Sequence, residues 1–121
     1  MGMGRKSIVG ERIWLEYFDQ NFKFKDAFTP QYCVIVRQFV GMNDGDDWYL
    51  VELKKPLQYE GANYDHLLIS SRWAGHFVGE VEPTAVFIML APEPEKINNP
   101  FELDRSLYIA WGFAANNKED I

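Results

Sequence analysis

The sequence predicts an all-β protein, with at most a short helical turn, built on a small antiparallel sheet that is strongly bent. Six apolar segments of strand length follow one another along the 121 residues, and none has the period of an amphipathic helix. Aromatic residues make up 16% of the chain, and flat rings pack well on a pleated surface. Such a sheet avoids exposed edges by closing into a six-stranded barrel, SH3-like or OB-like, or by folding into a compact sandwich. We expect a single domain over residues 1–121.

The first predicted strand covers residues 8–18. Ile13 and Leu15 alternate with Trp14, so the two aliphatic residues are expected to face the core and Trp14 to face outward. Residues 19–30 have no clean period and are interpreted as a long loop. Its three phenylalanines either plug one end of the core or belong to a functional lid.

The second and third strands are predicted at residues 32–40 and 48–53, and together they form a hairpin. The connection, residues 41–46, is rich in Asn, Asp and Gly, which tolerate the left-handed backbone of hairpin turns. Alternation places Trp48 on the outer face. Pro56 is expected to end the third strand, because proline cannot donate to a strand ladder.

The fourth strand is predicted at residues 64–73, after a loop over residues 57–63. Leu67 and Ile69 are expected to anchor it in the core. The fifth strand, residues 84–91, is an uninterrupted apolar run of the kind that is buried on both faces.

Residues 92–100 are interpreted as a solvated loop, at the end of which Pro100 opens one helical turn, because proline suits the first position of a helix. The sixth strand is predicted at residues 106–114. Its larger residues, Trp111 and Phe113 among them, are expected to face the core, with small residues opposite.

The net charge of −6 narrows the classes of partner. Acidic and basic residues balance over residues 1–55, so the whole acidic excess lies in residues 56–121. No basic stripe is present to replace the counterions of a polynucleotide, so nucleic-acid binding is not expected. The acidic half either keeps the protein soluble or meets a basic protein partner.

Cysteine usage and the apolar segments favour a cytoplasmic location. Cys33 is the single cysteine, so no disulfide forms within the chain. The basic residues at 1–6 are not followed by a continuous apolar segment, which argues against a signal peptide. The longest apolar run, residues 85–91, is too short to cross a bilayer. A reducing compartment and no membrane partner fit these features.

Asp65, His66 and Ser70 resemble a catalytic triad in composition, but strand geometry separates them. His66 and Ser70 share a face yet lie about 13 Å apart along a strand, beyond hydrogen-bond reach. Asp65 points to the opposite face. We therefore predict no catalytic residues in this stretch.

No metal or cofactor motif is present. His66 and His76 are not paired at the close spacing of a zinc site, and the turn at residues 43–47 lacks the closing glutamate of a calcium loop. No glycine-rich phosphate loop occurs. The sequence therefore predicts no metal ligands and no cofactor.

Aromatic recognition is the remaining chemistry. An arginine beside a tryptophan, as at Arg72 and Trp73, can hold a carboxylate or stack on a ring. The candidate binding residues are Trp48, Tyr64, His66, Arg72, Trp73 and His76.

From this patch we expect a non-enzymatic module that binds a protein or peptide through an aromatic surface. Two alternatives stay open. One is an acidic inhibitor or immunity-type protein that neutralises a basic enzyme, based on the acidic second half of the chain. The other is a small ligand-binding or enzymatic barrel in which His66, Arg72 and His76 line a pocket. The sequence does not indicate an oligomeric state.

Overall fold

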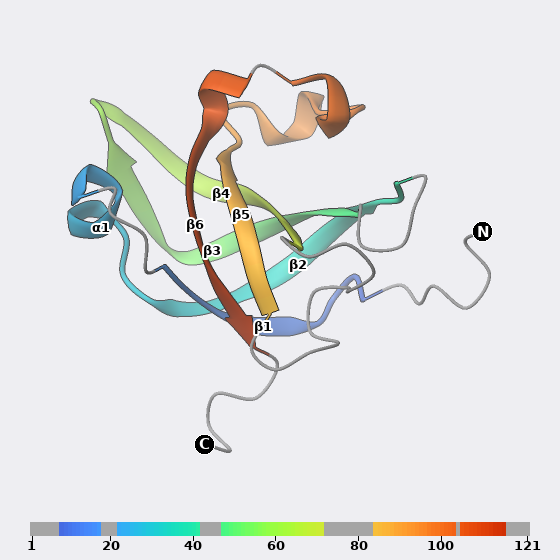
Figure 1. The fold of residues 1–121 in the computed structure, drawn as a ribbon, viewed down its shortest axis with the longest axis horizontal. Helices are drawn as coiled ribbons and strands as arrows, with labels where there is room; N and C mark the ends of the chain where they lie inside the picture. The colour runs from blue at the N-terminus through green and yellow to red at the C-terminus, as the bar shows by residue number, and fades with distance from the viewer. Residues whose placement is uncertain (1–7, 18–21, 42–46, 72–83, 104, 116–121) are drawn as a thin grey trace.

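Six antiparallel strands close into a barrel in the computed structural model of the chain, which describes residues 8–17, 22–41, 47–71, 84–103 and 105–115 (Figure 1). Each strand pairs with the next in sequence, and the last pairs with the first, so the barrel is an up-and-down meander. The elements are β1 (Arg12–Tyr17), α1 (Phe22–Ala27), β2 (Gln31–Phe39), β3 (Trp48–Tyr59), β4 (Ala62–Ser71), β5 (Thr84–Leu90), the 3-10 helices η1 (Pro94–Lys96), η2 (Pro100–Glu102) and η3 (Arg105–Leu107), and β6 (Tyr108–Ala115). The predicted bent all-β architecture is confirmed, as a barrel with the strand order of a meander rather than the Greek key of an OB-fold.

Alternating residues of the strands fill the barrel. Ile13 and Leu15 of β1 and Cys33 and Ile35 of β2 are buried in one apolar cluster, as the two-residue period predicts. Val34, between the last two, is 38% exposed on the outer face. Large aliphatic side chains from all six strands thus remove the interior from water, which is the main favourable contribution to folding.

A second apolar cluster lies outside the barrel wall. Leu50, Leu68 and Met89 are buried there together with Ile97, which belongs to the segment between β5 and β6. This segment lies at one end of the barrel in Figure 1 and covers the outer face of the central strands. Because this segment covers it, Leu68 is buried as deeply on the outer face as Leu67 and Ile69 are in the core. The prediction that Leu67 and Ile69 anchor β4 in the core is confirmed.

Two of the three phenylalanines before β2, Phe24 and Phe28, plug one end of the core, as one of the two sequence interpretations has it. Phe24 and Phe28 are buried with stacked rings 5.2 Å apart, and Phe24 meets the ring of Tyr59 edge-on. They lie four residues apart, the spacing that brings two side chains to one helix face. Residues 22–27 therefore form the short helix α1 in a stretch that the sequence predicts as loop.

β3 runs six residues further than predicted. Its pairing with β4 shifts register between Glu52 and Leu57, and this irregularity accommodates Pro56 without ending the strand. Ladder pairing resumes at Leu57 and continues to a turn at Glu60 and Gly61, both with positive φ. Most of the predicted loop at residues 57–63 is thus the end of a long hairpin.

A bulge in β6 reverses the predicted facing of that strand. Ile88 pairs with Ala110 and Met89 with Tyr108, so one residue of β6 is extra in the ladder. Beyond it the small residues Ala110 and Ala114 lie in the core, while Trp111 and Phe113 are only partly buried and outside the core cluster. The prediction that Trp111 and Phe113 face the core is therefore wrong. The helical turn predicted at Pro100 is confirmed by η2.

Candidate functional site

The sequence-predicted site does not assemble in the part of the chain that the structure describes. Arg72, Trp73 and His76 lie outside the described residues. Trp48 pairs with Ser70, and Tyr64 lies six residues before Ser70 on β4, about 20 Å away along the strand. Trp48 packs on the outer cluster and Tyr64 on the barrel core. These two rings therefore do not form one patch.

His66 lies between two carboxylates on the barrel wall. Its Nδ1 is 2.7 Å from Oδ1 of Asp65 and its Nε2 is 4.0 Å from Oε2 of Glu52, with 17% of the side chain exposed. Among the described residues, no group of three or more His, Cys, Asp or Glu side chains could hold a metal ion. The contacts of His66 are local ones on the surface of β3 and β4.

Ser70 and Asp47 have structural roles that the sequence does not reveal. The buried Ser70 hydroxyl donates to the carbonyl of Asp47 at 2.7 Å. The Asp47 carboxylate accepts hydrogen bonds from Gln38 Nε2 and from the backbone N–H of Gly41, each at 2.9 Å. Together they tie the start of β3 to β4 and to the end of β2.

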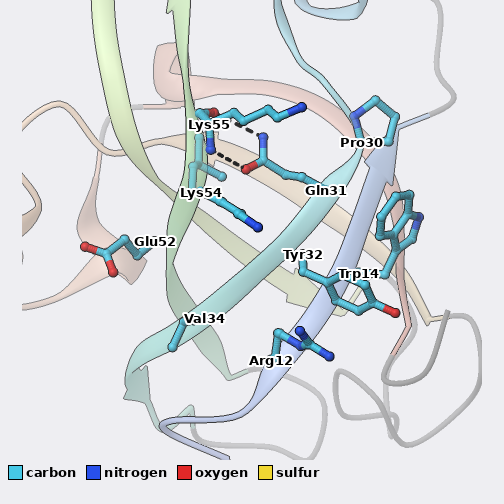
Figure 2. A pocket seen from close by; sticks show the side chains of 10 residues that line it. Arg12, Trp14, Pro30, Gln31, Tyr32, Val34, Glu52, Lys54 and Lys55 are labelled. Atoms are coloured by element: carbon cyan, nitrogen blue, oxygen red, sulfur yellow. Dashed lines mark hydrogen bonds between the residues drawn. The ribbon is translucent and has the colours of Figure 1, made fainter. Parts of the chain in front are cut away.

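A groove of about 530 Å³ lies on the outer face of β1, β2 and β3 (Figure 2). Its walls bring together aromatic rings, cations and a short apolar floor. The lining residues are Arg12, Trp14, Pro30, Gln31, Tyr32, Val34, Glu52, Leu53, Lys54 and Lys55. His66, Trp48 and Tyr64 are not among them.

Strand register assembles the groove from three separate parts of the sequence. Trp14 pairs with Tyr32, Arg12 pairs with Val34, and Val34 in turn pairs with Glu52. Because the residues between them fill the core, alternation turns these side chains outward. Trp14 is thus on the outer face, as predicted. Its neighbours in the groove can be identified only from the register of β1 with β2 and of β2 with β3.

At one end of the groove, β3 stops pairing with β2. The ladder between β2 and β3 ends at the pair Cys33 and Leu53, and two residues further along β3 the backbone of Lys55 is hydrogen-bonded by a side chain instead. Gln31 Nε2 donates to the Lys55 carbonyl at 3.1 Å, and Gln31 Oε1 accepts from the Lys55 N–H at 2.7 Å. The lysines are therefore held beside β2.

The aromatic wall is packed into a fixed arrangement. The guanidinium of Arg12 lies 4.3 Å from the centre of the Tyr32 ring, a cation–π distance. The rings of Trp14 and Tyr32 meet edge-on, 5.2 Å apart, and Trp14 Nε1 donates to Oε2 of Glu16 at 2.7 Å. Such contacts hold the rings in place before any ligand arrives.

The charge of the groove opposes that of the chain. Arg12, Lys54 and Lys55 line it, against the single carboxylate of Glu52. Within the described part of the chain, Lys54 and Lys55 form no ion pair, and Figure 2 shows Glu52 directed away from Lys54. The groove is therefore a basic and aromatic site on a protein whose net charge is −6.

Comparison of the chain with models of known protein families, with curated proteins and with solved structures finds no match. None of the described helices is long and apolar enough to cross a membrane. The groove supplies ring faces, cations and one carboxylate, which are groups that recognise a ligand. The chemistry of this groove is the basis of the functional proposal below.

Proposed function

We propose that the protein is a non-enzymatic binding module that takes an extended peptide segment of a partner protein in the groove across β1, β2 and β3. The observation that carries this proposal is the packed set of Arg12, Tyr32 and Trp14 beside two lysines that lack ion pairs in the described chain. This proposed function is the same as the one expected from the sequence. The aromatic surface is a different one, because the groove is lined by Trp14 and Tyr32 and not by Trp48 and Tyr64.

The dimensions and stiffness of the groove support a peptide ligand. A volume of about 530 Å³ holds a few amino-acid side chains. Aromatic rings give a large contact area at small loss of conformational entropy, and here they are already immobilised by their neighbours. Val34 adds an exposed apolar floor between the rings and Glu52.

The arrangement of the rings favours a peptide over a nucleic acid. Single-stranded nucleic acids stack their bases on open aromatic faces. Arg12 covers one face of Tyr32, and Trp14 presents its ring edge-on to the same residue. A long polyanion would also meet the acidic surface that a net charge of −6 implies. A short segment of a protein avoids that repulsion.

Peptide-library selection on the immobilised protein, followed by amide chemical-shift mapping, tests this proposal. We expect selected peptides to shift amide signals of β1, β2 and residues 52–55. Trp14→Ala should weaken binding about tenfold or more, as loss of a central aromatic contact does. The matched control is Tyr108→Ala, which removes an exposed ring from β6, away from the groove. It should leave affinity within about twofold.

Either of two results would refute the groove as a peptide site. One is a library that yields no binder, and the other is an equal loss of affinity in Trp14→Ala and Tyr108→Ala. The melting temperature of each variant distinguishes lost binding from lost folding. We also propose a cytoplasmic location, which the free thiol of Cys33, the single cysteine, supports.

A further inference from the structure

We infer that the peptide bound in the groove is acidic, with a carboxylate side chain that docks on Lys54 and Lys55 next to a residue packed on Trp14. This inference rests on the proposed function and adds the chemical class of the partner. It reverses the expectation of a basic partner that the net charge of the chain suggests.

The first argument is the state of the two lysines. Lys96, on the exposed helix η1, has its charge matched by Glu93 at 2.9 Å. Lys54 and Lys55 are also exposed, but within the described residues they have no such carboxylate. The acidic residue in the groove lining, Glu52, lies instead near His66, with 4.0 Å between Oε2 and Nε2. Two adjacent positive charges are thus left for a ligand.

The second argument is that the backbone places both lysines on the groove. Successive residues of a regular strand point to opposite faces, so only one lysine would line it. The register shift after Glu52 and the two hydrogen bonds between Gln31 and the Lys55 backbone change this. Figure 2 shows both lysine side chains extending from β3 towards β2, with Lys55 above the Gln31 side chain and Lys54 below it.

The third argument is the order of the chemical groups along the groove. The lysines lie at one end, the rings of Tyr32 and Trp14 follow, and Arg12 lies beyond (Figure 2). An extended peptide with an apolar or aromatic residue flanked by carboxylates matches this order. Charge complementarity of this kind raises the association rate and excludes basic competitors.

The test uses three nine-residue peptides of one design, with a central tryptophan flanked by glutamates, by glutamines or by lysines, and a nine-nucleotide single-stranded RNA as a fourth probe. Affinity is measured by titration calorimetry at low and high salt. We expect the glutamate peptide to bind up to about tenfold more tightly than the glutamine peptide, towards the upper end of what two exposed ion pairs contribute. The difference should shrink at high salt.

The decisive variant is the double substitution Lys54→Gln and Lys55→Gln. It should reduce affinity for the glutamate peptide about tenfold and leave the glutamine peptide unchanged. The control is the double substitution Lys23→Gln and Lys96→Gln, which changes the net charge equally at exposed lysines outside the groove. It should leave both affinities within about twofold.

The outcomes separate the two proposals. Equal binding of the glutamate and glutamine peptides, lost in Trp14→Ala, would overturn the acidic partner and keep the peptide site. An equal loss of affinity for the glutamate peptide in the groove variant and in the control variant would also overturn the acidic partner, because the loss would then follow from net charge alone. Binding of the RNA alone, or of no probe, would overturn both proposals.

Discussion

The side-chain amide of Gln31 takes the place of a strand partner for the backbone of Lys55. Its Nε2 donates to the Lys55 carbonyl at 3.1 Å and its Oε1 accepts from the Lys55 N–H at 2.7 Å. The same Nε2 donates to the carbonyl of Thr29 at 3.0 Å, and Gln31 is 5% exposed. Backbone groups removed from water must find partners, so this amide allows β3 to leave the ladder beside the groove.

Replacing Gln31 should therefore destabilise the fold. Gln31→Leu removes three partly buried hydrogen bonds to the backbone of Lys55 and Thr29, and we expect a loss of about 2 kcal/mol. Gln31→Glu keeps an acceptor for the N–H but loses the donor, so it should fall between Gln31→Leu and the wild type. Urea denaturation of the three proteins measures the order.

The control for this series is Gln58→Leu, which removes an exposed amide from β3, the strand that carries Lys55. It should change the free energy of unfolding by less than about 0.5 kcal/mol. A Gln31→Leu protein as stable as Gln58→Leu would contradict the bridging role of Gln31.

The architecture could be predicted because it follows from local pattern. Alternation identifies the inward residues of β1 and β2, and the apolar run of β5 indicates burial on both faces. Which residues of β6 point inward could not be predicted, because the extra residue near Ile109 arises from the pairing with β5 and has no signature in the local sequence. The helix α1 is too short for a period to identify it.

The groove could be predicted only in part. Alternation places Trp14 outside the barrel, but its neighbours Arg12, Tyr32 and Lys54 come from three strands whose register no local rule supplies. The sequence instead draws attention to polar residues that are adjacent in the chain, such as Asp65 and His66. Strand alternation predicts that these two side chains point to opposite faces, but in the structure they meet at 2.7 Å. They form a local contact on the barrel wall and do not line the groove.

The β3–β4 turn offers a test of backbone strain. Glu60 and Gly61 have φ of 50° and 83°, the signs required by a two-residue turn of type I′. Glu60→Asn should stabilise the protein by about 0.5 kcal/mol, because asparagine adopts positive φ more readily than glutamate. Gly61→Ala should destabilise it by about 1 kcal/mol, although an added Cβ would meet no atom within 4 Å.

Thermal unfolding checks both changes. Glu60→Ala is the control for loss of the glutamate side chain and should not reproduce the gain of Glu60→Asn. An unchanged melting temperature in Gly61→Ala would show that positive φ at this turn is not required in solution.

Arg37 should hold the segment between β5 and β6 on the barrel wall. Its Nη1 donates to the carbonyl of Ile97 at 2.8 Å, and its guanidinium lies 4.5 Å from the centre of the Phe39 ring. Arg37→Ala should lower the free energy of unfolding by about 1 kcal/mol and speed hydrogen exchange at the Lys96 and Ile97 amides. Lys23→Ala, at an exposed cation of α1, is the control and should do neither. Unchanged exchange in Arg37→Ala would exclude this role.

Cys33 should resist thiol reagents until the protein unfolds. Its side chain is 1% exposed, and burial raises the pKa of the thiol from 9.0 to about 12. At pH 8 only about one folded molecule in ten thousand carries the reactive thiolate, against about one in ten when unfolded. A disulfide reagent should therefore label the native protein slowly and the urea-unfolded protein within seconds. Rapid labelling of the native protein would contradict this burial.

The same pKa predicts how stability depends on pH. A pKa that is higher in the folded state adds stability that is complete below pH 9 and is lost as the pH rises towards about 12. The free energy of unfolding of the wild type should therefore fall, relative to that of Cys33→Ala, which has no thiol to ionise, by about 3 kcal/mol between pH 8 and pH 11. Tyrosines and lysines titrate in both proteins, so their contribution cancels in this difference. A constant difference over that range would mean that Cys33 ionises in the folded barrel as readily as in the open chain.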